Sequence, residues 1–380
     1  MKKLLPEVCT IQYGFPFDSA KFSDSNGMPL IRIRDVVRGY SETYTTEEYK
    51  SEYIVHENDL LIGMDGEFNI AKWGKTPALL NQRVCRLAPK DSIDKDYLFY
   101  FMPVALKRIE EKTPFVTVKH LSAKELNKIE IPVLPLEEQR KIAETLSKVD
   151  ELIAFREQQL AKLDELVKAR FVEMFGDLVA PQCEYPELKL VDICADADDI
   201  KCGPFGTQLN RDEYKAKGVA VWEIPQINSG FSEMPTHFIT EEKAVILNAY
   251  SIEPGDIAMS RKGNVGKCGL FPENLKKGII HSDVLRIRVD KRKVDSCFMM
   301  YQLHFSEAVK RQIEMVSSGA IMAGINVTKL KQIKVRIPEL ENQRMFAAFV
   351  ERVDQQKQTI QQSLEKLELL KKALMQEYFG

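Results

Sequence analysis

The sequence predicts an α+β fold in which two mixed α/β domains alternate with two long helices as an internal repeat. The half-polar segment LEEQRKIAETLSKVD at residues 136–150 returns as LENQRMFAAFVERVD at residues 340–354. Each copy opens a stretch without proline or glycine that closes in Phe-Gly, and the block before each copy is itself repeated. We therefore expect domains at residues 1–136 and 177–340, and long helices at residues 137–176 and 341–380.

Both long helices carry the same start and stop signals. Pro135 and Pro338 precede them, acidic residues such as Glu137 and Glu341 lie in their first turns, and a Phe-Gly pair ends each one. At a rise of 1.5 Å per residue, about 40 helical residues form a rod of about 60 Å.

The apolar residues of both helices alternate in steps of four and three, which is the spacing of a coiled-coil seam rather than of an ordinary core helix. The seam consists of Ile142, Leu146, Val149, Ile153, Leu160, Leu163 and Val167 in the first helix, and of Phe346, Val350, Val353, Ile360, Leu364, Leu367 and Leu374 in the second. Polar residues interrupt it at Arg156, Arg170, Lys357 and Lys371. Such breaks lower stability but fix register and partner. The alternative is that each helix packs only on its own neighbouring domain.

Within the two domains, matching segments keep one order although the loops differ in length. HENDLLIGMDGEFNIAKWG at residues 56–74 parallels IEPGDIAMSRKGNVGKCG at residues 252–269, and each joins an apolar strand to a glycine-containing loop. The other matching pairs are GMPLIRIRDV (27–36) with GVAVWEIPQI (218–227), NQRVCRL (81–87) with HSDVLRI (281–287), GFPF (14–17) with GPFG (203–206), and LSAKELNKIEIPVLP (121–135) with INVTKLKQIKVRIP (325–338). The last pair predicts a short helix followed by a strand. The repeated part of the first domain starts almost directly at Ile11, so the sequence does not show whether this domain has the first strand of the second domain.

Charge excludes binding of nucleic acid through a generally basic surface. The chain has a net charge of −2; residues 1–136 hold 19 basic and 19 acidic side chains, and residues 177–340 hold 22 of each. Any nucleic-acid site must therefore be a local patch or be completed by a partner.

Other sequence features indicate a cytoplasmic protein with reduced thiols. No apolar stretch approaches the roughly 18–20 residues that cross a bilayer, and the start MKKLLPEVCTIQYGF lacks the apolar core of a signal peptide. The seven cysteines form no CxxC pair and no histidine lies near them at ligand spacing, so reduced, partly buried thiols are favoured over a metal shared by Cys194 and Cys202.

We find no motif for catalysis. Asn69 stands where a phosphate-binding loop would need the glycine that precedes Gly74-Lys75-Thr76, and an N/D-P-P-Y/F segment and a glycine-rich cofactor loop are both missing. The five histidines show no spacing to serine or cysteine that predicts a nucleophile. We therefore expect a non-catalytic protein with no metal or cofactor of its own.

The two L-E-x-Q-R…V-D helices that end in Phe-Gly, together with the segments Asp59-Leu60-Leu61-Ile62 and Gly255-Asp256-Ile257, resemble the specificity subunit of a type I restriction–modification system. The resemblance covers essentially the whole chain. It implies two target recognition domains, each reading one half of a split target in double-stranded DNA, and two helices paired antiparallel as a ruler that sets the spacer. It also implies that two modification (methyltransferase) subunits dock here and transfer methyl groups from S-adenosylmethionine to adenines, and that a restriction subunit with a helicase-like motor can join them. The duplication gives pseudo-two-fold symmetry, so that two copies of one partner can bind equivalently.

The two glycine-containing loops are our candidate DNA-binding segments, because glycine lets the backbone approach phosphate closely and basic residues flank both loops. The candidate residues are Arg34, Arg38, Asn69, Lys72, Lys75, Gln208, Asn210, Arg261, Lys262, Asn264 and Lys267. Lysines and Arg261 suit phosphate, asparagine and glutamine suit adenine edges, and Arg34 and Arg38 suit either. The alternative is that these glycines only form hairpin turns.

The two tryptophans and the near-neutral charge of the domains give two further expectations. Trp73 and Trp222 are expected in hydrophobic cores rather than as stacking platforms for bases. A second hypothesis for the whole chain is a coiled-coil scaffold that presents two protein-binding domains, which the near-neutral charge of the domains also fits.

Overall fold

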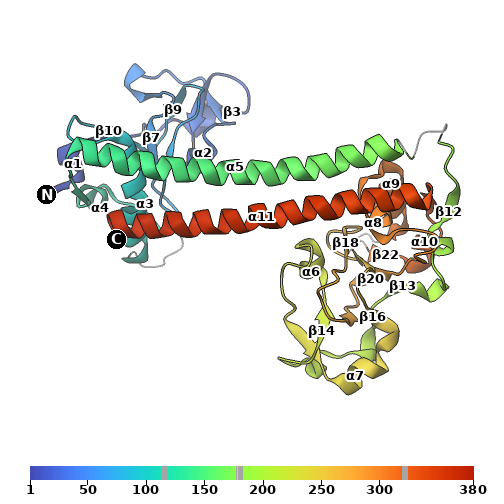
Figure 1. Ribbon diagram of the computed structural model, residues 1–380. Coiled ribbons are helices and arrows are strands. Elements are labelled where there is room, and N and C mark those ends of the chain that lie inside the picture. Colours follow the sequence, from blue (N-terminus) through green and yellow to red (C-terminus); the bar gives the residue numbers. More distant parts are fainter. Residues whose placement is uncertain (113–118, 177, 179–182, 319–323) are drawn as a thin grey trace. The chain divides into compact units, whose positions relative to one another are not determined.

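A computed structural model describes residues 1–112, 119–176, 178, 183–318 and 324–380 (Figure 1). The chain divides into two compact units. The first unit comprises Met1–Gln158 and Gln361–Gly380, and the second comprises Gln159–Ile360. Each long helix therefore contributes one part to each unit.

The first unit combines two larger sheets with short and medium-length helices. Its strands are β1 (Lys2–Leu4), β2 (Cys9–Tyr13), β3 (Phe22–Ser23), β4 (Met28–Ile31), β5 (Tyr44–Thr45), β6 (Ile54–Val55), β7 (Leu60–Gly63), β8 (Asn69–Lys72), β9 (Ala78–Leu80), β10 (Val84–Pro89) and β11 (Glu130–Pro132). Its helices are α1 (Leu5–Val8), α2 (Ile33–Arg38), α3 (Lys95–Lys112) and α4 (Ala123–Asn127), together with the starting part of α5 and the final part of α11. The sheets have the orders β2-β10-β7-β8 and β3-β5-β4-β9-β6.

The second unit repeats this frame. Its strands are β12 (Glu187–Lys189), β13 (Ile200–Cys202), β14 (Val219–Trp222), β15 (His237–Ile239), β16 (Ser251–Ile252), β17 (Ile257–Ser260), β18 (Cys268–Leu270), β19 (Gly278–Ile280), β20 (Val284–Ile287), β21 (Ser317–Ser318), β22 (Gly324–Ile325) and β23 (Lys334–Arg336). Its helices are α6 (Ile224–Asn228), α7 (Glu241–Ile246), α8 (Ser296–Phe305), α9 (Glu307–Val316) and α10 (Val327–Leu330). The orders β13-β20-β17-β18 and β15-β14-β19-β16 correspond to the two sheets of the first unit, and the parallel pair β14–β19 corresponds to β4–β9.

The structure answers the question about the first strand. β1 pairs antiparallel with β11, just as β12 pairs with β23 in the second unit. Leu4 opposes Glu130 and Lys189 opposes Lys334. In both domains the first strand therefore pairs with the strand that directly precedes the long helix. The short helix and strand expected from the repeated segments before each long helix are also confirmed, as α4–β11 and α10–β23.

Each unit has its own hydrophobic core. The four-stranded sheet of the first unit packs with α3, α4, the start of α5 and the end of α11, and the corresponding sheet of the second unit packs with α8, α9, the end of α5 and the start of α11. Trp73 and Trp222 are almost fully buried in smaller clusters beside the sheets, which confirms the expectation that they are core residues. In the part of the chain that the structure describes, no helix has the length and apolar character needed to cross a membrane.

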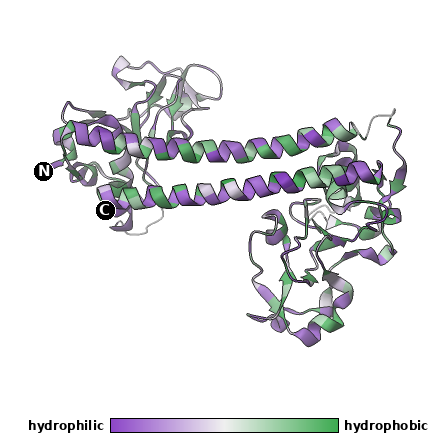
Figure 2. Ribbon diagram, viewed as in Figure 1, coloured by the Kyte–Doolittle hydropathy of each residue, from purple (hydrophilic) through white to green (hydrophobic). Residues whose placement is uncertain are grey.

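The two long helices are α5 (Leu136–Phe175) and α11 (Leu340–Phe379), each of 40 residues (Figure 1). Gly176 follows α5 with a φ of 64°, and its N–H donates to the Val172 carbonyl at 2.8 Å, so it forms the expected glycine stop. Figure 2 shows hydrophobic residues recurring along both helices between hydrophilic ones. Every residue of the predicted seam is buried or half-buried, as the prediction requires, and several of them also belong to the domain cores.

Contacts within the second unit establish that the helices run antiparallel. Asp164 of α5 pairs with Lys357 of α11, whereas further along α5 the ring of Phe171 lies 5.4 Å from that of Phe346. Residue numbers thus rise along one helix as they fall along the other. The helices pair with each other and also complete the domain cores, so the alternative that each packs only on its own domain is wrong.

A buried glutamine ties the start of each long helix to its domain. Gln139 accepts a hydrogen bond from the Asp94 N–H at 2.7 Å and donates to the Leu134 carbonyl at 2.8 Å. Gln343 accepts from the Asp295 N–H at 2.9 Å and donates to the Pro338 carbonyl at 2.6 Å. This is the glutamine of the repeated L-E-x-Q-R motif, which fixes the direction in which the long helix leaves its domain in both repeats.

Candidate nucleic-acid interface

The two candidate loops occupy the same place in the two units. The first glycine loop (residues 64–68) joins β7 to β8, and the second glycine loop (residues 261–267) joins β17 to β18. Gly66 and Gly263 stand at positive φ, 78° and 67°, and a Cβ at either position would have open space around it. Both tips therefore project without covering atoms from the described residues, and a left-handed backbone is needed at each.

The same hydrogen bonds hold both loops at their base. The Met64 N–H donates to the Arg83 carbonyl at 2.9 Å, and the Arg261 N–H donates to the Asp283 carbonyl at 2.8 Å. The Leu121 N–H donates to the Met64 carbonyl at 2.7 Å, and the Ile325 N–H donates to the Arg261 carbonyl at 3.1 Å. The loops are thus more than tight hairpin turns, because each is anchored to two segments distant in sequence.

The charges at these matching positions are reversed. In the first unit Asp65 lies 3.5 Å from Arg83, whereas in the second unit Lys262 lies 2.8 Å from Asp283. His120 adds a contact to Asp65 with 2.5 Å between Nδ1 and Oδ1. The first loop is acidic and the second is basic, so the two domains present different chemistry on one frame.

The basic second loop carries four of the predicted residues. Arg261 Nε donates to the Ile325 carbonyl at 3.2 Å, and Lys262 forms the ion pair with Asp283. Asn264 is exposed beside the tip, and Lys267 donates to the Asn228 carbonyl at 2.9 Å. All four residues lie on this one loop, and the side chains of Arg261, Lys262 and Lys267 each contact a different segment of the second unit.

A pocket of about 600 Å³ lies between the second glycine loop and helices α8 and α9; Asn264, Lys267, His304 and Lys310 are among its lining residues. Partial burial lowers the pKa of His304, and the neighbouring lysines 310, 267 and 168 lower it further because they disfavour a second positive charge. Both effects favour the neutral form of the imidazole beside a basic loop.

The predicted residues Gln208 and Asn210 lie in a neighbouring segment, and both form hydrogen bonds within the second unit. Gln208 Oε1 accepts hydrogen bonds from the Phe205 N–H at 3.0 Å and the Tyr250 hydroxyl at 3.1 Å. Asn210 is exposed at the start of a short 3₁₀ turn, and its backbone N–H donates to Glu213 at 2.7 Å. This geometry favours a structural role for the Gln208 side chain.

The predicted residues of the first unit are more dispersed. Lys72 pairs with Asp96 at 2.9 Å and lies over the ring of Phe99. Asn69 donates to the Glu67 carbonyl at 3.3 Å, and its side-chain oxygen is buried.

The other three predicted residues of this unit are more accessible. Lys75 is exposed, Arg34 lies 3.7 Å from Asp35, and Arg38 lies 3.7 Å from Glu42. The Arg38–Glu42 pair is exposed on both sides, and such pairs are weak and exchange readily for contacts with a ligand, whereas Asp35 is buried beneath Arg34.

Three functional features escaped the sequence reasoning. The ring of Phe205 packs on Arg261, Asp283 holds Lys262, and Gln139 and Gln343 anchor the long helices. Gln139 and Gln343 recur in the two L-E-x-Q-R motifs, so repetition was a signal for them alone, whereas the partners of Arg261 and Lys262 are set by the alignment of strands.

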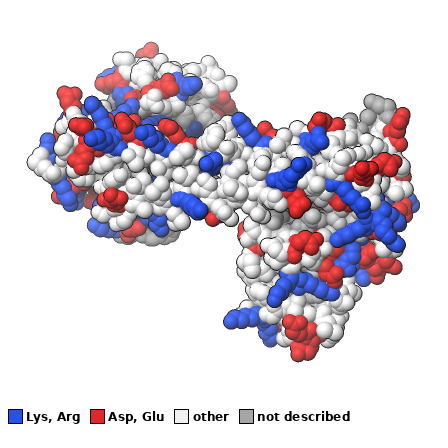
Figure 3. Space-filling view, in the orientation of Figure 1, with Lys and Arg blue, Asp and Glu red and all other residues white. Residues whose placement is uncertain are grey.

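The cysteines and the metal-binding residue types give no sign of a second site in the described ranges of the chain. All seven cysteines are free, and burial raises the pKa of Cys9, Cys85, Cys194 and Cys268 to about 12. Among the described residues no group of histidine, cysteine, aspartate and glutamate side chains is arranged to hold a metal ion. On the face seen in Figure 3, lysine and arginine are interspersed with aspartate and glutamate over both units.

The repeated frame and its loops match a known family. The family model described as the type I restriction modification DNA specificity domain matches residues 1–165 and again residues 199–369. The chain belongs to this family. The expected resemblance to type I specificity subunits is thereby confirmed.

Relatives within the type I specificity family match along most of the chain. The specificity subunit of the type I restriction enzyme EcoBI from Escherichia coli is 28% identical over 376 residues, covering 92% of this chain and 78% of the relative. The MjaVIII specificity subunit from Methanocaldococcus jannaschii is 25% identical over 379 residues, covering 91% and 87%.

Solved structures show the same fold. The S subunit of a type I restriction–modification system from M. genitalium matches with a TM-score of 0.61 at 17% identity, covering 100% of this chain and 96% of that one. A second structure, described as the basis of complex assembly and conformational transition of the type I system, matches with a TM-score of 0.60 at 17% identity, covering 100% and 97%. The fold predicted from the sequence, with two mixed domains and an antiparallel helix pair, is confirmed.

Proposed function

We propose that this chain is the DNA-recognition subunit of a type I restriction–modification complex, and that each domain reads one half of a bipartite target in double-stranded DNA. The observation that carries the proposal is the pair of glycine loops, held by matching hydrogen bonds in each of two repeats. A scaffold that only joins two proteins has no need of matching open loops. Membership of the DNA specificity family supports the same function.

We assign the two target recognition domains to residues 1–136 and 177–340, and the ruler to the helix pair. A bipartite reader needs its two readers at a fixed separation, which stiff helices provide better than a flexible linker. Half-sites read from one face of DNA lie about 34–36 Å apart per helical turn, so helices of this length suit the task. The ion pairs between α5 and α11 support one fixed register.

The proposed partners follow from the internal symmetry and from the names of the relatives. Two modification subunits dock on the two repeats, bind S-adenosylmethionine and methylate adenines, and a restriction subunit joins them. This chain supplies recognition and no catalysis, and it acts in the cytoplasm, where its DNA is.

The proposed DNA contacts differ between the domains. In the second domain, Lys262, Asn264 and Lys267 of the basic loop contact the backbone and base edges. In the first domain, whose glycine loop is acidic, Lys75, Arg34 and Arg38 are the accessible cations among the predicted residues, and carboxylates accept hydrogen bonds from the amino group of cytosine.

Sequencing of methylated bases in the host genome tests this function. Deleting the gene for this chain should abolish adenine methylation at one bipartite sequence, and the purified chain with its modification subunits should bind that sequence specifically. Unchanged methylation, together with a purified complex that lacks sequence preference, would favour the protein-scaffold hypothesis instead.

A further inference from the structure

An arginine of the second glycine loop is fixed against an exposed aromatic ring. The Arg261 guanidinium lies 4.8 Å from the centroid of the Phe205 ring, and its Nε donates to the Ile325 carbonyl at 3.2 Å. Phe205 is 45% exposed, so the pair stands at the surface. Stacking on one face and a hydrogen bond at Nε together define both the plane and the direction of the guanidinium.

The ring of Phe205 is itself held in place. The Phe205 N–H and the Tyr250 hydroxyl both donate to Gln208 Oε1, and the Gln208 N–H returns a bond to the Phe205 carbonyl at 3.1 Å. The turn that carries the ring is therefore held by its own hydrogen bonds and by Tyr250, the residue just before β16, before any ligand arrives.

The outer edge of the guanidinium has no recorded partner among the described residues. Within the described part of the chain, the structure records no hydrogen bond or ion pair to the two Nη atoms of Arg261, whereas Lys262 beside it is paired with Asp283. Two parallel N–H donors with a fixed plane match the O6 and N7 acceptors of guanine in the major groove. A phosphate contact needs no such fixation, because phosphate accepts hydrogen bonds from many directions.

The described residues of the first unit hold no such arrangement at the corresponding place. Met64 stands at the position of Arg261 and is buried, and the exposed ring of Phe15 contacts Phe17 and Tyr53 instead of an arginine. The arrangement is thus a property of one domain and not of the repeated frame.

We propose that Arg261 is a specificity-determining residue that reads one guanine in the half-site of the second domain, and that Phe205 is the residue that positions it. This inference rests on the proposed DNA-recognition function. In this proposal Arg261 contacts a base, whereas Lys262 and Lys267 contact phosphate groups.

The test uses the complex of this chain with its modification subunits and the target found by methylation sequencing. Binding is measured to duplexes in which each base pair of the second half-site is substituted in turn. The native complex should discriminate at one G·C pair by about 10-fold to 100-fold, as a bidentate arginine does. Arg261→Ala and Arg261→Lys should both abolish this discrimination and leave it intact at the other positions.

Variants of Phe205 test whether its ring positions the Arg261 guanidinium or only fills space. Phe205→Leu keeps an apolar side chain without a π face and should lower discrimination at the same G·C pair, whereas Phe205→Tyr should retain it. Phe15→Leu, in the first domain, is the matched control and should leave the second half-site unchanged. A structural defect would instead weaken binding to every duplex equally.

Two results overturn the inference while leaving the proposed function intact. One is uniform weakening by Arg261→Ala with full rescue by Arg261→Lys, which is the behaviour of a phosphate contact. The other is a second half-site in which no G·C pair depends on Arg261. A native complex without any sequence preference would remove the proposed function as well.

Discussion

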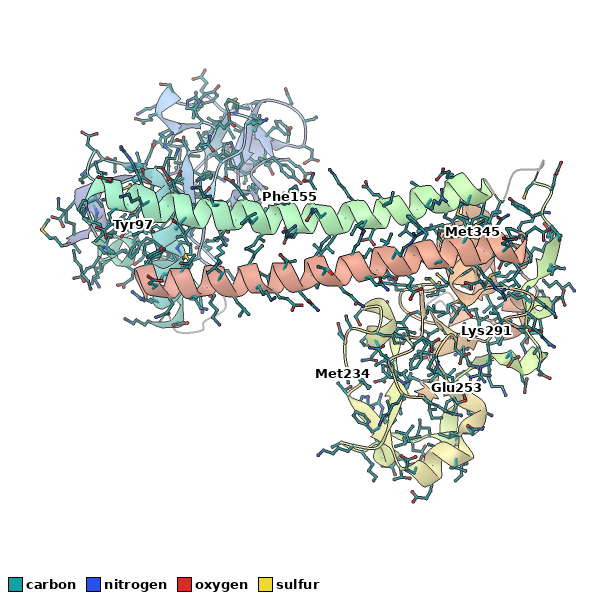
Figure 4. The ribbon with its side chains drawn as sticks, viewed as in Figure 1. Tyr97, Phe155, Met234, Glu253, Lys291 and Met345 are labelled. Carbon is teal, nitrogen blue, oxygen red and sulfur yellow. The ribbon has the colours of Figure 1, made fainter. Side chains whose placement is uncertain are left out.

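Lys371 of α11 and Asp150 of α5 form an ion pair with 2.6 Å between Nζ and Oδ1, and the Tyr100 hydroxyl donates to the other carboxylate oxygen at 3.0 Å. The lysine lies on the seam of the helix pair, where an apolar residue would give more stability but less specific register. Tyr97 of the same helix as Tyr100, labelled in Figure 4, packs on Phe379 at the end of α11. The end of α11 is therefore attached both to α5 and to the first domain.

We expect Asp150→Ala and Lys371→Ala to be energetically coupled by about 0.5–1 kcal/mol in a double-mutant cycle, because the pair is half-exposed. Thermal unfolding of the helices, followed by circular dichroism, measures this coupling. Lys372, the exposed neighbour, provides the control, since Lys372→Ala should show no coupling to Asp150→Ala. Equal coupling in both cycles would mean that the ion pair does not set the register.

The buried glutamines should matter more for stability than any surface pair. Gln343→Ala leaves the Asp295 N–H and the Pro338 carbonyl without their partner, and each unpaired buried group costs about 1–3 kcal/mol. Of the two tryptophans in the chain, Trp73 lies in the first unit and Trp222 in the second. In a Trp73→Phe background, urea unfolding followed by fluorescence therefore reports the second unit alone.

Gln355→Ala, at an exposed glutamine of the same helix, is the control and should be close to neutral. If Gln343→Ala is equally neutral, apolar contacts hold the start of the helix. The recurrence of the two glutamines would then have to be explained by contacts with partner subunits.

The second unit should become less stable in mild acid through His304. Its pKa in the folded state lies below the ordinary value of 6.5, so the unfolded chain takes up a proton first as the pH falls. The stabilisation is complete above the unfolded pKa and is lost as the pH falls through the folded pKa. The Trp222 unfolding midpoint should therefore drop as the pH falls below the ordinary histidine pKa of 6.5, and by less in His304→Gln. Identical pH profiles for the two proteins would show that other groups control the acid response.

Salt dependence tests the basic loop. Replacing Arg261 and Lys262 with alanine should weaken target binding by the assembled complex and lower the slope of log K against log salt by about 0.9 for each phosphate that is no longer neutralised. Lys276→Ala removes an exposed lysine of the same unit outside the second glycine loop and serves as the control. Binding that is unchanged at every salt concentration would exclude this loop from the interface.

The sequence predicted the parts of this molecule that follow from local periodicity. The seam spacing and the Phe-Gly ends define α5 and α11 to within a residue, because a long helix is encoded by its own residues. The pair Phe205–Arg261 could not be predicted, since it exists only when β13, β20 and β17 align side by side. The hydrogen bonds of Gln208 and the reversed ion pairs of the two loops could not be predicted for the same reason. They depend on which residues are neighbours in the fold, and sequence spacing does not reveal that.

Exchange of one domain tests the assignment of one domain to one half-site. Replacing residues 1–136 with the corresponding domain of another family member should change only one half of the methylated sequence, because the first glycine loop and the strands that hold it all lie within that segment. The core of this domain also includes Ile142, Leu146 and Phe379 from the two long helices. An exchange that also carries over residues 137–158 and 361–380 should therefore give the same specificity with a higher unfolding midpoint. Methylation sequencing reads the outcome, and a change in both halves of the target would show that recognition is shared between the domains.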